Sequence, residues 1–115
     1  MAEGIEDVIG LPDPVGQNLQ TINRPNGLVI QKVRVPFGVI GIIYESRPNV
    51  ASDCVSLCLK SGNSVILKGG KEAQYSNDAI FKVLRGSLKD TRVPVDAVQM
   101  IASVDRKAVN ILLSL

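Results

Sequence analysis

An apolar run, a segment of helical spacing and a second apolar run follow one another between residues 37 and 68, and this order constrains the fold more than any other feature. Residues 37–44 lack alternating polar side chains, as expected of a strand covered on both faces. Residues 64–67 form a second run that leads into a glycine turn. Because a parallel neighbour needs a crossover connection of about this length, the pattern predicts two parallel strands joined by a helix.

The N-terminal quarter contains weaker signals. Residues 2–9 are expected to form a short helix that ends before Pro12, because proline fixes φ and lacks an amide donor. Residues 15–27 are interpreted as a connector that ends in the turn signal Asn26-Gly27. The β-branched residues of 28–35, interspersed with polar ones, predict a strand with one wetter face.

Helix boundaries are predicted from caps and glycines. The first helix of the strand–helix repeats is expected to begin near Asn49, whose side chain can cap free amides, and to end at Gly62. A second helix is expected to begin near a cap at Ser76 or a neighbour, and a third from residues 103–105, with a strand at residues 97–102 between them. The buried stripes are predicted at Val50, Cys54, Leu57 and Cys58 of the first helix and at Ile80, Val83, Leu84 and Leu88 of the second.

The fold class is therefore predicted to be α/β, with a partial, open, mostly parallel sheet and flanking helices. A hydrophobic fraction of 45% in 115 residues indicates a folded core within one domain. The net charge of +2 comes from 13 basic and 11 acidic residues without a run of either sign, which argues against nucleic-acid or membrane-surface partners. The acidic N-terminus lacks the regions of a signal peptide, so a cytoplasmic protein is expected.

Cysteine and histidine usage narrows the chemistry. Cys54 and Cys58 are the two cysteines, and there is no histidine. Two thiolates alone cannot complete the usual four-ligand zinc site, and adjacent turns of one helix suit a disulfide poorly. We therefore expect buried, reduced thiols and no metal, and the lack of histidine excludes histidine-dependent catalytic triads.

The segments VPFGVIGIIYESRPNV and LCLKSGNSVILKGGKEA resemble the gamma-glutamyl phosphate reductase (glutamate-5-semialdehyde dehydrogenase) family of the aldehyde dehydrogenase superfamily. The resemblance runs from about residue 11 to the last residue. It implies a Rossmann-like, NADPH-dependent reductase that converts L-glutamyl 5-phosphate to glutamate 5-semialdehyde in proline biosynthesis. Residues 1–115 would then be part of its cofactor-binding domain, with a helix and connector at 1–27 and the strand and strand–helix repeats at 28–115.

The expected cofactor site lies at the end of the strand predicted at residues 64–67. In open α/β sheets ligands bind at the carboxyl ends of the strands, where Lys68 lies. In the superfamily the lysine at this position reaches the adenosine ribose, and the resemblance implies this role for Lys68. Gly69 and Gly70 would let backbone amides approach a phosphate or ribose, Lys71 would neutralise a phosphate and favour NADPH, and Glu45 would border the site. The alternatives are an exposed lysine and an ordinary turn.

The segment Glu45-Ser46-Arg47-Pro48-Asn49 ends the preceding strand and is expected to converge on the same crevice. Arg47 could grip a carboxylate or phosphate of the substrate, or form a surface salt bridge. Ser46 and Asn49 are the other expected substrate-binding residues. In the superfamily this elbow reads Pro-Trp-Asn-Phe-Pro, and its asparagine stabilises an oxyanion. Counting back from the shared Gly-Asn pair places Glu45 opposite that asparagine, so capping is the alternative for Asn49.

Enzymes of this family use a cysteine that forms a thioester with the acyl group, and the resemblance places it in a later domain. Cys54 and Cys58 match no part of that motif, so these 115 residues are expected to lack reductase activity alone. The chain ends in an apolar helix without a visible cap, which predicts a piece of a longer protein and self-association through unpartnered faces. The alternative is a short, non-catalytic nucleotide-binding or self-assembling α/β module.

Overall fold

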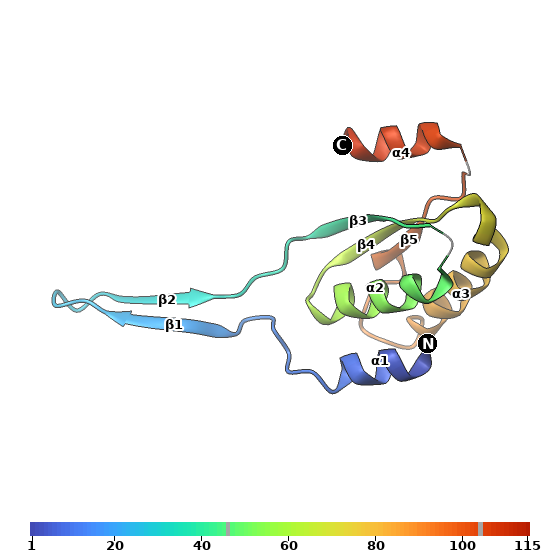
Figure 1. Cartoon of the computed structure of the whole chain (residues 1–115). Helices are drawn as coiled ribbons and strands as arrows, with labels where there is room; N and C mark the ends of the chain where they lie inside the picture. Colours follow the sequence, from blue (N-terminus) through green and yellow to red (C-terminus); the bar gives the residue numbers. More distant parts are fainter. Residues whose placement is uncertain (46, 104) are drawn as a thin grey trace.

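The computed structural model describes residues 1–45, 47–103 and 105–115 and contains a three-stranded sheet with helices on both faces (Figure 1). Two helices, α2 and α3, pack on one face of this sheet, α1 lies outside α2, and α4 crosses the opposite face. A two-stranded hairpin projects from this body. In chain order the elements are α1 (Ala2–Ile9), β1 (Asn18–Asn23), β2 (Val29–Val33), β3 (Val39–Ile43), α2 (Pro48–Lys60), β4 (Ser64–Lys68), a 3-10 turn (Lys71–Ala73), α3 (Gln74–Ser87), a second 3-10 turn (Val95–Ala97), β5 (Val98–Met100) and α4 (Arg106–Leu113).

The three-stranded sheet is parallel, with strand order β3-β4-β5, as the strand–helix–strand pattern predicts. Ile43 is paired with Lys68, and Leu67 is paired with Met100. Because the strands are parallel and in this register, their carboxyl ends lie together at one edge. The α/β fold class is confirmed, and this edge is where a ligand site is expected.

The core lies between the sheet and the two helices α2 and α3. Val65 and Leu67 of β4 are fully buried because this strand is central and α2 covers it. The expected stripe of α2 is wrong at Leu57, which is 50% exposed, because α2 buries the neighbouring row Ala51, Val55 and Cys58. The expected stripe of α3 is likewise wrong at Val83, which is 72% exposed. The other three residues of that stripe, Ile80, Leu84 and Leu88, do face the core, so the α3 prediction fails at Val83 alone, whereas the buried row of α2 is turned from the predicted one.

The interpretation of residues 15–27 as a connector is wrong, because β1 lies within this range. β1 pairs antiparallel with β2, and Gly27 turns between them with a φ of +87°. Every residue of both strands is exposed, so β2 lacks the buried face that a strand with one wetter face should have. β1 carries no alternation of apolar and polar residues because neither of its faces packs on the core, and sequence periodicity therefore could not reveal it.

The prediction that β3 is covered on both faces is also wrong within this chain. Ile40 and Ile42 turn toward the core, whereas Val39 on the other face is 65% exposed. On that second face α4 makes a close contact, since a Cβ placed on Gly41 would lie 3.5 Å from Leu112 Cδ1. The helix covers only part of the strand.

Two expected side-chain caps are not formed. Arg47, not Asn49, occupies the cap position of α2, and α3 begins at Gln74, two residues before Ser76. In both helices the preceding geometry starts the first turn: Pro48 fixes φ at the first position of α2, and a 3-10 turn leads into α3. By contrast, α4 has the polar cap expected near its start, because Asp105 Oδ1 accepts a hydrogen bond of 2.9 Å from Lys107 N.

Candidate functional site

The ends of β3 and β4 and the loops that follow them form one edge. Tyr44 N donates to Lys68 O at 3.0 Å, which extends the pairing of the two strands by one residue. Gly70 lies against the next residue, since a Cβ at Gly70 would be 3.4 Å from Glu45 Cα. The prediction that these two loops converge is therefore confirmed for Glu45 and the glycine turn.

A cavity of about 600 Å³ opens at this edge. This volume falls within the roughly 300–1,000 Å³ that small-molecule and cofactor sites occupy. Its charged lining combines three cations, Lys68, Lys71 and Arg106, with the carboxylates of Glu45 and Glu72. Such a cavity suits a ligand that carries several anionic groups together with hydroxyls, because cations bind the first and carboxylates accept from the second. The backbone of Gly69 and Gly70 forms part of the same wall.

Lys68 is held inside the site. Its side chain is only 5% exposed, and its Nζ donates to Gly69 O at 2.9 Å. The alternative of a solvent-exposed lysine at a strand end is therefore wrong. A buried ammonium with a single recorded hydrogen bond among the described residues retains donor capacity for a ligand in the cavity.

The glycine turn supplies backbone as well as space. Within the described part of the chain, no recorded hydrogen bond uses the N–H of Gly69 or Gly70. At Gly70 the φ of −78° would suit any residue, but a Cβ there would approach Glu72 Oε2 to 3.3 Å and reduce the space beside the turn. The turn can therefore present two amide donors to an anion.

Arg106 is a member of the cavity wall that sequence reasoning missed. It comes from the first turn of α4, which crosses the sheet face and brings Arg106 and Val109 to the ends of β3 and β4. The signal was its position directly after the Asp105 cap, beyond the end of the third parallel strand. That signal places Arg106 at the correct edge, but only the packing of α4 shows which cavity it lines.

The predicted substrate-binding residues are not gathered in this cavity wall. Arg47 is exposed at the start of α2, and Asn49 is exposed in its first turn. Ser46 lies outside the described residues. The alternative for Arg47, a surface salt bridge, is not recorded among the described residues, where the one recorded ion pair joins Arg85 to Asp96 at 2.5 Å.

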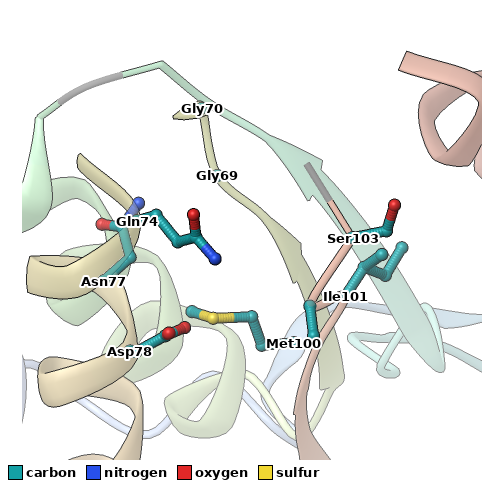
Figure 2. Close-up of a pocket in the computed structure, with 9 residues that line it drawn as sticks. Gly69, Gly70, Gln74, Asn77, Asp78, Met100, Ile101 and Ser103 are labelled. Atoms are coloured by element: carbon teal, nitrogen blue, oxygen red, sulfur yellow. The ribbon is translucent and has the colours of Figure 1, made fainter. Parts of the chain in front are cut away.

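A smaller hollow lies on the other side of the glycine turn, between α3 and the end of β5 (Figure 2). Figure 2 shows Gln74 and Asn77 extending from α3 toward Gly69 and Gly70, with Met100 opposite them. At about 20 Å³ the hollow is too small for a nucleotide or substrate. It therefore belongs to the support of the turn rather than to a second ligand site.

Three titrating groups near α2 have perturbed pKa values. Burial raises the pKa of the Cys58 thiol, and the neighbouring Cys54 raises it further. Burial and the charge of Asp53 raise the pKa of Cys54, and burial chiefly raises the pKa of Tyr44. A raised thiol pKa leaves little thiolate at neutral pH, so neither cysteine is suited to be a nucleophile. Both thiols are free, as expected, although Cys54 is only half-buried.

The described residues contain neither a metal-ligand cluster nor a membrane-spanning helix. In that part of the chain, no cluster of three or more histidine, cysteine, aspartate or glutamate side chains could hold a metal ion. None of the helices described in the structure is long and apolar enough to cross a membrane.

The chain is similar along its whole length to known enzymes. It is 54% identical over 115 residues to the gamma-glutamyl phosphate reductase of Paramagnetospirillum magneticum and 56% identical over 115 residues to that of Carboxydothermus hydrogenoformans. It spans 27% and 28% of these two relatives, or about a quarter of their length. No family model matches the chain.

Two solved structures share the fold. The crystal structure of gamma-glutamyl phosphate reductase from Thermotoga maritima matches with a TM-score of 0.90 at 50% sequence identity, over 93% of this chain and 26% of that one. The crystal structure of gamma-glutamyl phosphate reductase from Saccharomyces cerevisiae matches with a TM-score of 0.84 at 38% identity, over 91% of this chain and 28% of that one. The fold and the family resemblance of the sequence are both confirmed.

Proposed function

Because the chain is homologous over its whole length to gamma-glutamyl phosphate reductase, we propose that it is a segment of the NADPH-binding part of such an enzyme. The complete enzyme would reduce L-glutamyl 5-phosphate to glutamate 5-semialdehyde and phosphate in proline biosynthesis. NADPH supplies the hydride for that reduction when it is bound. The observation that carries the proposal is the cavity in which a glycine turn and three cations meet at the carboxyl edge of the parallel sheet.

The residues present fit an anionic dinucleotide. Lys68 would donate to a ribose hydroxyl, and the amides of Gly69 and Gly70 would donate to phosphate oxygens. Glu45 at the end of β3 would accept from a ribose hydroxyl. Lys71 and Arg106 provide more positive charge than a pyrophosphate alone requires. We therefore assign to them the additional 2′-phosphate that distinguishes NADPH from NADH.

We propose substrate binding for the loop that follows β3 and the first turn of α2. Arg47 and Asn49 are exposed at the start of α2, on the loop that follows β3. From that position they would contact a substrate that lies beside the cofactor, at the edge of the cavity. Ser46 shares this proposed role. The catalytic cysteine would come from elsewhere in the enzyme, because the raised pKa values of Cys54 and Cys58 disfavour the thiolate, so residues 1–115 alone would give no turnover.

Calorimetric titration of the 115-residue chain with NADPH tests the cofactor assignment. Lys68→Met should weaken binding by roughly tenfold or more, because a hydrogen bond from a charged group contributes about 1.5–3 kcal/mol. Lys89→Met is the matched control, since Lys89 is exposed after the end of α3 and does not line the cavity. Equal NADPH affinity in the Lys68→Met and unmodified chains would refute the assignment of Lys68.

The second candidate function is a self-assembling module, and the exposed apolar surface of the hairpin favours association in either case. In β1 and β2 the side chains of Leu19, Val29 and Ile30 are each more than 40% exposed. Unpaired strand edges and apolar faces of this kind pair readily with other chains. We propose a homo-oligomer, which sedimentation equilibrium would detect as a mass above that of one chain. A monomer at all concentrations would count against it.

A further inference from the structure

Three buried polar atoms beside the glycine turn have no hydrogen-bond partner. Tyr44 Oη, Asn77 Nδ2 and Asn77 Oδ1 are the side-chain atoms of this kind in the part of the chain that the structure describes. Asn77 is only 2% exposed, so water in bulk does not reach it. A buried donor or acceptor without a partner is costly, and a native structure with such a group requires an explanation.

Both side chains touch the same glycine. A Cβ on Gly69 would collide with Asn77 Nδ2 and would lie 3.3 Å from Tyr44 Cζ. The amide of Asn77 therefore lies directly against Gly69, and Figure 2 shows it extending from α3 toward the turn. Asn77 Nδ2 nevertheless makes no recorded hydrogen bond to the Gly69 peptide group in the part of the chain that the structure describes.

The carbonyl of Gly69 is occupied by another donor. Lys68 Nζ bonds to Gly69 O at 2.9 Å, which turns the ammonium onto the backbone of its own loop. A nucleotide that draws the Lys68 ammonium further into the cavity would take it away from this carbonyl. The carbonyl would then lose its partner unless a nearby donor replaced the lysine, and Asn77 Nδ2 is an unpartnered donor that lies against the same residue.

We propose that nucleotide binding exchanges the donor to the Gly69 carbonyl from Lys68 Nζ to Asn77 Nδ2, while Tyr44 Oη donates to Asn77 Oδ1. The exchange satisfies the three orphaned atoms and frees the ammonium of Lys68 for the nucleotide. Asn77 is thus a positioning residue, because it acts through Gly69 and Lys68 and not on the ligand. This inference rests on the proposed NADPH-binding function.

The protonation of Tyr44 agrees with this role. Burial raises the pKa of the Tyr44 hydroxyl, with smaller contributions from Cys54 and Asp78. The hydroxyl therefore keeps its proton throughout the neutral range and can donate to Asn77 Oδ1. A polar relay of this kind is stabilised in a low-dielectric interior only when each of its members is paired.

Asn77→Leu tests the exchange, because leucine has a similar size but no polar atoms. In calorimetric titration its NADPH affinity should fall by about tenfold, the loss expected when the charged donor Lys68 stays on Gly69 O. In urea unfolding its midpoint should be unchanged or raised, because an unpartnered buried amide has been replaced by an apolar group. Ser76→Ala, at an exposed neighbour on α3, is the control and should change neither value.

The combination with Lys68→Met separates the outcomes. If Asn77 acts through Lys68, the double variant Lys68→Met/Asn77→Leu binds NADPH as weakly as Lys68→Met alone. Additive losses, an unchanged NADPH affinity in Asn77→Leu, or a fall in both affinity and urea midpoint would each overturn the inference and leave the proposed function standing. Absence of NADPH binding by the unmodified chain would overturn both.

Discussion

Gly69→Ala is a sharp test of how the site is built, because the backbone does not require glycine there. The glycines with positive φ are Gly16, Gly27, Gly38 and Gly62, so alanine can adopt the conformation of Gly69. The obstacle is a side-chain contact: the added methyl group would collide with Asn77 Nδ2 and lie 3.3 Å from both Asn77 Cγ and Tyr44 Cζ. These neighbours are buried and cannot turn away into solvent.

The magnitude follows from two opposing terms. Overpacking of a buried site costs about 1–3 kcal/mol, because surrounding side chains leave their preferred rotamers. Restricting the unfolded chain returns about 0.4–1 kcal/mol when glycine becomes alanine. Gly69→Ala should therefore lower the free energy of unfolding by about 1–2 kcal/mol. Gly70→Ala should change it by less than about 0.5 kcal/mol, since its nearest contact, 3.3 Å to Glu72 Oε2, is with the end of an exposed, flexible side chain.

Urea unfolding followed by circular dichroism at 222 nm measures both values. The double variant Gly69→Ala/Asn77→Ala isolates the contact: in the Asn77→Ala background, the alanine at position 69 should cost at least about 1 kcal/mol less than in the unmodified chain. An equal cost for Gly70→Ala and Gly69→Ala, or simple additivity of the effects at Gly69 and Asn77, would show that the Asn77 contact does not decide the need for glycine at position 69.

Two further predictions concern the charged and titrating groups. Arg106→Ala should weaken NADPH binding by about tenfold or more and NADH binding less, because only NADPH carries the 2′-phosphate assigned to this guanidinium; equal losses by calorimetry would contradict the assignment. Burial raises the pKa values of Cys54, Cys58 and Tyr44, so folding disfavours the charged forms of these side chains. Their contribution to the free energy of unfolding should be constant below the ordinary pKa values of 9.0 and 10.0 and should be lost as the pH rises through the raised pKa values of the folded protein. Urea midpoints between pH 7 and pH 10.5 would show this fall, Cys54→Ala should reduce it, and a midpoint that rises above pH 9 would disprove the sign.

Sequence reasoning succeeded where local chemistry decides the structure. The apolar runs at residues 37–44 and 64–67 are strands of a parallel sheet, and Lys68 lies at the edge where such sheets bind ligands. It failed where packing decides. The hairpin strand β1 is exposed on both faces and therefore leaves no periodic pattern. Leu57 of α2 is half exposed because the helix buries the neighbouring row, and Val83 of α3 is exposed although the rest of its predicted stripe faces the core.

The alternation of the three parallel strands with helices, the glycine turn after β4 and the kinship with gamma-glutamyl phosphate reductases could be predicted from the amino-acid sequence. These depend on residue type and spacing along the chain. Three features became visible in the folded chain: Arg106 lines the cavity, Lys68 bonds to Gly69, and the amide of Asn77 lies unpaired beside the same glycine. Each of these depends on contacts between residues that are brought together by the packing of α3 and α4 on the sheet, and such contacts leave no local signal in the sequence.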